Sequence, residues 1–122
     1  MKSVLVVDDE PGMREMVKQL LLNEGYHVLE ASNGKHVMEF MKNETPELVI
    51  TDIIMEEMDG VAIILEIREN YPDVKIIAMS GGKKISSEDY LESASGLGTD
   101  RIFTKPFALS DMLNAIKELI EE

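Results

Sequence analysis

The sequence predicts one α/β domain in which a parallel sheet carries helices on both faces. Five short runs of β-branched or aliphatic residues recur along the chain, and an amphipathic segment follows each of them after a short connection. Right-handed crossovers between successive strands turn such an order into a parallel sheet covered on both sides. The 122 residues fit a single domain, which buries roughly two-thirds of the surface that its unfolded chain exposes.

The first two strand and helix pairs occupy residues 4–41. The first strand covers residues 4–7, and Pro11 suits the first turn of the helix that follows. Residues at helical spacing predict the apolar side of this helix: Met13, Met16, Val17, Leu20 and Leu21. Residues 26–30 alternate like a half-buried, peripheral strand, and Asn33 is expected to cap the next helix. The inward side of that second helix is expected to be Val37, Phe40 and Met41.

The third pair follows Pro46. Its strand covers residues 48–52 and ends on Asp52, and the loop over residues 53–60 is unusually apolar for exposed backbone. A helix is predicted from Val61 to Asn70, where residues 71–73 end it. The expected inward stripe of this helix is Ile64, Leu65 and Ile67.

The last two pairs complete the sheet. A fourth strand over residues 76–80 ends on Ser80, and a weak helix is predicted to begin near Ser86. We expect this helix to be the least firmly held part of the fold because it has few apolar anchors. A fifth strand ends on Lys105. The closing helix carries an apolar stripe formed by Leu109, Met112, Leu113, Ile116, Leu119 and Ile120.

The composition restricts the possible functions. The chain has 24 acidic and 12 basic residues and a formal net charge of −12. Because this charge repels nucleic-acid backbones and anionic membranes, we expect neither as a direct partner. The absence of cysteine excludes disulfides and thiolate zinc sites, and the first apolar run is too short for a signal peptide or a membrane span. We therefore expect a cytoplasmic protein.

Four of the strands end on polar side chains that suit one site. These are Asp8-Asp9, Asp52, Ser80 and Lys105. Ligands of open parallel sheets bind outside the carboxyl ends of the strands, so we expect these groups to meet there. A carboxylate such as Asp52 is a recognised nucleophile in phosphoryl transfer. Three neighbouring carboxylates repel one another, and Mg²⁺, a hard cation with oxygen ligands, removes that cost.

Five motifs occur in order along the chain. They are Val6-Val7-Asp8-Asp9-Glu10, Asp52 followed by Met55, Met58-Asp59-Gly60, Ser80 after an apolar run, and Lys105-Pro106-Phe107. Together they resemble the receiver domain of two-component response regulators, of the CheY-like kind, over the whole chain. The resemblance implies a flavodoxin-like, five-stranded parallel sheet of order 2-1-3-4-5 with five helices on two faces. It also implies that residues 1–122 form one receiver domain without an output domain in the chain.

The resemblance implies roles for particular residues. Asp52 would be the phosphoacceptor and a metal ligand, Asp9 would bind Mg²⁺ directly, and Asp8 would hold it through water. Ile54 would offer its backbone carbonyl to the metal.

Other residues would read the phosphorylated state. By the same resemblance, Ser80 and the adjacent Gly81 would meet the phosphoryl group, Lys105 would pair with one of its oxygens, and the peptide bond before Pro106 would be cis. Ile102 departs from the family, because an aromatic residue that follows the movement of the hydroxyl commonly occupies this position.

The implied function is a phosphoacceptor switch and not a classical enzyme. A sensor histidine kinase or phosphotransfer protein would phosphorylate Asp52, with self-phosphorylation from small phosphodonors and self-dephosphorylation as further reactions. The face formed by the fourth helix, fifth strand and fifth helix would then bind a downstream protein. The chain would act as a monomer or as a phosphorylation-dependent dimer.

Several alternatives stay open at this point. Asp8 and Asp9 could simply cap the first helix, and Lys105 could be a surface charge. A haloacid-dehalogenase-like phosphatase also combines an Asp nucleophile with Mg²⁺, although its nucleophile lies on the first strand. The chain could equally be a receiver domain excised from a larger regulator.

Overall fold

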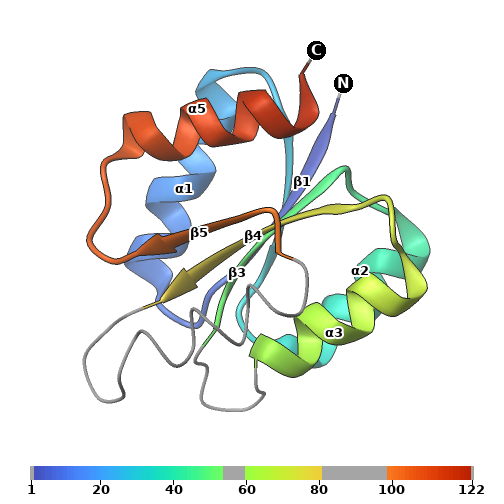
Figure 1. The fold of residues 1–122 in the computed structure, drawn as a ribbon. Coiled ribbons are helices and arrows are strands. Elements are labelled where there is room, and N and C mark those ends of the chain that lie inside the picture. The colour runs from blue at the N-terminus through green and yellow to red at the C-terminus, as the bar shows by residue number, and fades with distance from the viewer. Residues whose placement is uncertain (1, 54–59, 81–98, 122) are drawn as a thin grey trace.

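The computed structural model describes residues 2–53, 60–80 and 99–121. Five parallel strands form one sheet in the order β2-β1-β3-β4-β5 (Figure 1), which confirms the predicted fold class and strand order. The strands are β1 (Ser3–Val7), β2 (His27–Ala31), β3 (Leu48–Asp52), β4 (Lys75–Ser80) and β5 (Arg101–Thr104). The helices are α1 (Pro11–Asn23), the 3₁₀ turn η1 (Gly34–His36), α2 (Val37–Asn43), α3 (Gly60–Asn70) and α5 (Leu109–Ile120). The weak helix predicted near Ser86 lies outside the described residues.

Helices α1 and α5 lie on one face of the sheet, and α2 and α3 lie on the other (Figure 1). Each face has its own apolar core. Leu5 and Val7 of β1 belong to the core under α2 and α3, whereas Val4 and Val6 belong to the core under α1 and α5. All four side chains are fully buried. The unbroken apolar run of β1 is therefore the pattern of a central strand of a parallel sheet, covered on both sides.

The register of the strands brings their carboxyl ends level. Val7 of β1 pairs with Thr51 of β3, and Asp52 pairs with Met79 of β4. Ser80 pairs with Thr104 of β5. The residues that end these strands are therefore collected along one edge of the sheet, as the sequence predicted.

Two residues of the predicted apolar stripes point away from the core. Met16 of α1 is 46% exposed and Leu65 of α3 is 50% exposed. In α3 the buried positions are Gly60, Ile63, Ile64 and Ile67. They follow the spacing of one narrow helix face, so Leu65, one residue beyond Ile64, lies off that face. The prediction that both residues belong to the inward stripes was wrong.

Pro11 and Asn33, the residues expected to begin the first two helices, both lie at helix starts, but Asn33 caps a different turn from the one predicted. Pro11 is the first residue of α1. Asn33 does cap a helical turn, but its Oδ1 accepts the N–H of Lys35 at 2.8 Å, so it caps η1, and α2 starts after that turn. Among the helices that the structure describes, none is long and apolar enough to cross a membrane.

Candidate functional site

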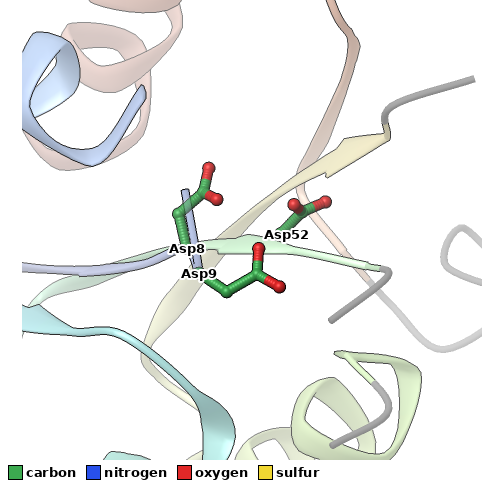
Figure 2. Close-up of side chains that lie close together, drawn as sticks. All are labelled: Asp8, Asp9 and Asp52. Atoms are coloured by element: carbon green, nitrogen blue, oxygen red, sulfur yellow. The ribbon is translucent and has the colours of Figure 1, made fainter. Parts of the chain in front are cut away.

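Three carboxylates converge at the carboxyl edge of the sheet (Figure 2). Asp8 follows β1, Asp9 follows Asp8, and Asp52 ends the neighbouring strand β3. Each offers one oxygen that lies within 4.8 Å of the other two. Asp8 and Asp52 are buried, whereas Asp9 is exposed. The cluster is therefore fixed on the sheet side and open to solvent on the side of Asp9.

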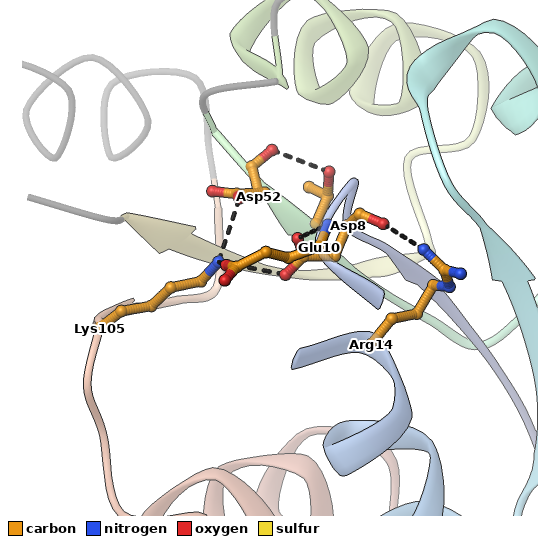
Figure 3. A network of polar contacts seen from close by, with 6 residues as sticks. Asp8, Glu10, Arg14, Asp52 and Lys105 are labelled. Carbon is orange, nitrogen blue, oxygen red and sulfur yellow. Dashed lines mark hydrogen bonds and ion pairs between the residues drawn. The ribbon is translucent and has the colours of Figure 1, made fainter. Parts of the chain in front are cut away.

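Lys105 bridges two of these carboxylates. Its Nζ lies 3.1 Å from Oδ2 of Asp8 and 3.1 Å from Oδ2 of Asp52 (Figure 3). Burial lowers the pKa of the Lys105 ammonium, but the Asp52 and Asp8 carboxylates raise it by more, so its pKa lies above the ordinary value. The ammonium is therefore charged at neutral pH. It offsets one of the three negative charges and leaves the cluster anionic.

The backbone holds Lys105 in this position. Its N–H donates to the Ser80 carbonyl at 2.7 Å, which extends the pairing of β5 with β4 by one residue. The peptide bond between Lys105 and Pro106 is cis. Phe103 and Phe107 flank this segment with ring centroids 5.5 Å apart, and both pack against the core under α1 and α5.

Ser80 places an unsatisfied hydroxyl at the end of β4. Its side chain is fully buried, and its Oγ has no hydrogen-bond partner among the described residues. A buried hydroxyl without a partner costs roughly 1–3 kcal/mol. A ligand oxygen bound beside Ser80 would remove that cost.

Gly60 brings α3 against the backbone of Asp52. Its N–H donates to the Ile53 carbonyl at 2.9 Å, and a Cβ at this position would lie 2.3 Å from the Asp52 carbonyl oxygen. Gly60 belongs to the predicted loop motif, but no pattern in the sequence explains why a glycine is needed there. That reason is the close approach of helix and strand directly behind the carboxylate.

The comparisons with known proteins agree with this geometry. The sequence profile described as the response regulator receiver domain matches residues 4–117. The chain belongs to this family. It is 33% identical to the response regulator receiver protein CpdR of Brucella abortus, and the match covers 98% of each chain. It is also 33% identical to a segment that makes up 13% of the sensor kinase CckA of the same organism, a match over 98% of this chain.

A solved structure supports the same conclusion. The CheY-like receiver domain protein from Methanospirillum hungatei JF-1 superposes with a TM-score of 0.87 at 30% identity. The superposition covers 97% of this chain and 92% of that one. The predicted resemblance to CheY-like receiver domains is thus confirmed.

Within this receiver domain, the chemistry of the acidic cluster fits a divalent cation. Its donors are carboxylate oxygens, the ligands that hard cations prefer, and the exposed side leaves room for water molecules in the coordination shell. Two residues predicted at the site, Ile54 and Gly81, lie outside the described residues.

Ile102 of β5 is partly buried and packs against the core under α2 and α3. Its neighbour Phe103 packs against the opposite core. Because successive strand residues face opposite sides of a sheet, Phe103 does not take the place of the aromatic side chain that the family resemblance implies at position 102.

Proposed function

We propose that this receiver domain accepts a phosphoryl group on Asp52 from a sensor histidine kinase or a phosphotransfer protein. The observation that carries the proposal is the bridge from Lys105 to both Asp8 and Asp52 within a cluster of three carboxylates. An Asp52 oxygen attacks the phosphorus of a phosphohistidine. A new O–P bond forms, the N–P bond breaks, and the imidazole leaves with its electron pair and takes up a proton. The product is an acyl phosphate.

Mg²⁺ is the proposed cofactor. Asp9 and Asp52 would hold it directly and Asp8 through water, and the ion would offset negative charge on the transferred phosphoryl group. Lys105 contributes charge at the same place. Its ammonium already contacts Asp52, so it is positioned to pair with a phosphoryl oxygen attached to that residue. Positioning and electrostatic stabilisation account for most of the catalysis in phosphoryl transfer.

Phosphorylation would act as a switch. It adds close to two negative charges and three strong acceptors at Asp52, which contacts Lys105 and pairs with Met79, the residue before Ser80. The hydroxyl of Ser80 is buried without a partner among the described residues. We propose that Ser80 binds a phosphoryl oxygen and that the change reaches the face that includes β5 and α5. Ile102 cannot report it by aromatic rotation. The backbone hydrogen bond from Lys105 to Ser80 is the direct link between the two groups that meet the phosphoryl.

The partners follow from the family and the charge. A sensor kinase relative that contains a similar segment supports a histidine kinase pathway as the source of the phosphoryl group. The net charge of −12 favours a protein as the downstream target over direct contact with nucleic acid.

Acetyl phosphate labelling tests the proposal. The protein is incubated with acetyl phosphate and MgCl₂, and its intact mass is measured for the wild type, Asp52→Asn and the control Asp73→Asn, an exposed acid in the turn before β4. We expect one phosphoryl adduct in the wild type and the control, and none in Asp52→Asn or in the presence of EDTA. An adduct that persists in Asp52→Asn would refute the assignment. Multiple-turnover hydrolysis of ordinary phosphomonoesters would favour a phosphatase instead.

Amide hydrogen exchange tests the switch separately. Beryllofluoride, a phosphoryl mimic, is added with Mg²⁺, and exchange is followed by mass spectrometry. We expect altered protection within residues 81–107 and little change in the amides of β2. Unchanged exchange across residues 81–107 would contradict the proposed route while leaving the phosphoacceptor assignment intact.

A further inference from the structure

Arg14 of α1 connects the acidic cluster to the edge of the sheet. Its Nη1 donates to the backbone carbonyl of Asp8 at 2.8 Å (Figure 3), and its Nε donates to Oε1 of Glu30 at 3.3 Å. Glu30 lies on β2, and its other oxygen pairs with Lys18 of α1 at 3.1 Å. Arg14 and Glu30 are both partly buried, with side chains 20% and 33% exposed. Glu30 therefore holds the Arg14 side chain in place, and Arg14 in turn donates a hydrogen bond to the backbone carbonyl of Asp8.

The carbonyl that Arg14 binds lies at the point where the chain leaves the sheet. Strand β1 ends at Val7, and the N–H of Asp8 still donates to the Ala31 carbonyl of β2 at 3.1 Å. The next peptide group along the chain joins Asp8 to Asp9, and its oxygen accepts the hydrogen bond from Arg14. This peptide group sets the direction in which the exposed Asp9 leaves the buried Asp8. The orientation of one carboxylate relative to the other thus depends on the guanidinium.

We propose that Arg14, anchored by Glu30, is a positioning residue that holds the Asp8–Asp9 turn in the geometry that binds the divalent cation. This inference rests on the proposed role of the acidic cluster. It predicts an effect opposite in sign to simple electrostatics. As a nearby positive charge, Arg14 should weaken cation binding, whereas as a positioning group it strengthens it.

Lys18 provides the matched control. It is one turn further along α1, carries the same charge and pairs with the same Glu30, but its ammonium makes no ion pair with Asp8 in the described part of the chain. Replacing either residue by Met removes one positive charge and one contact to Glu30 while keeping an apolar stem. Only the change at Arg14 also releases the Asp8 carbonyl.

The test is calorimetric titration with MgCl₂ at fixed ionic strength. We expect Arg14→Met to bind Mg²⁺ about tenfold more weakly than the wild type, the lower end of the effect of groups that orient metal ligands. Lys18→Met should bind Mg²⁺ as tightly as the wild type or more tightly. Arg14→Lys should recover part of the loss, because an ammonium can still donate to the Asp8 carbonyl. Equal affinities of Arg14→Met and Lys18→Met would overturn the proposal.

Two further measurements distinguish a failure of this inference from a failure of the proposed cation site and from a loss of folding. Asp9→Asn must abolish Mg²⁺ binding if the cluster is the cation site, and a wild type that binds no Mg²⁺ would overturn both proposals together. Urea unfolding without Mg²⁺ detects a purely structural defect. If Arg14→Met does not fold, Glu30→Met replaces it, since it leaves Arg14 in place and removes the carboxylate that anchors it. Affinity in Glu30→Met equal to that of the wild type would overturn the proposal.

Discussion

Substitution of Gly60 by Ala tests how tightly α3 is fitted behind Asp52. The new Cβ would lie 2.3 Å from the Asp52 carbonyl oxygen and 2.5 Å from that of Ile53, whereas ordinary contacts begin at 3.4 Å. The start of α3 must therefore move by about 1 Å, because moving the backbone of the central strand β3 would disturb the close packing on both faces of the sheet. Overpacking of this kind costs roughly 1–3 kcal/mol. Weakening the Gly60 to Ile53 hydrogen bond adds about 1 kcal/mol.

We expect Gly60→Ala to lower the free energy of unfolding by about 3 kcal/mol, which corresponds to a fall in Tm of roughly 10 °C for a domain of this size. Urea titration followed by circular dichroism measures the first quantity, and a thermal scan measures the second. Phosphorylation by acetyl phosphate should also slow, because the shift is transmitted to the backbone of Asp52.

Gly12→Ala is the matched control for this experiment. Gly12 lies in the exposed first turn of α1, and a Cβ there meets nothing within 4 Å. Alanine is the better helix former by up to about 1 kcal/mol, so this variant should be as stable as the wild type or more stable. The reasoning would be refuted by a Gly60→Ala protein whose stability lies within about 0.5 kcal/mol of the wild type.

Three further perturbations probe other parts of the structure. Asp100→Ala should lower the free energy of unfolding by about 2 kcal/mol, because Oδ2 of Asp100 accepts the buried Ile76 N–H at 2.8 Å. The control Glu118→Ala removes an exposed ion pair and should lower the free energy of unfolding by less than about 0.5 kcal/mol. Urea titration measures both values. Burial and a hydrogen bond to a carboxylate raise the pKa of Tyr26 above its ordinary 10.0, so its phenol stays protonated in the folded state where the unfolded chain ionises. The wild type should therefore lose stability above about pH 10, and Tyr26→Phe should lose less when unfolding is measured on both sides of that pH. Lys105→Met should tighten Mg²⁺ binding about tenfold in a calorimetric titration, because the ammonium no longer competes for the carboxylates; weaker binding would contradict this.

Much of the fold could be predicted because its signals are local. Runs such as residues 4–7 and 48–51 are short and rich in β-branched residues, which is typical of buried strands, and the segments between the strands carry helical periodicity. The limit of that reasoning is visible at Met16 and Leu65. Periodicity defines a broad stripe on a helix, but which edge of the stripe meets the sheet depends on how the helix is rotated in its packing.

The residues of the candidate site could be predicted from the sequence, but the contacts between them could not. Asp8, Asp52 and Lys105 lie at the carboxyl ends of strands, and parallel strands end along one edge of the sheet, so their convergence followed from topology alone. The bridge made by the Lys105 ammonium did not follow from it. It depends on the reach of one side chain and on the hydrogen bond that holds its backbone to Ser80.

By itself, the sequence determined the class of fold, the order of the strands through its family resemblance, and the residues that end at the site. The tertiary structure alone decided how those residues are held. Arg14 binds the Asp8 carbonyl only because α1 packs beside β2, where Glu30 anchors it, and Gly60 is required only because α3 touches the backbone of Asp52. Such contacts depend on how neighbouring elements pack, and no local pattern of apolar and polar residues records the distance between two packed elements.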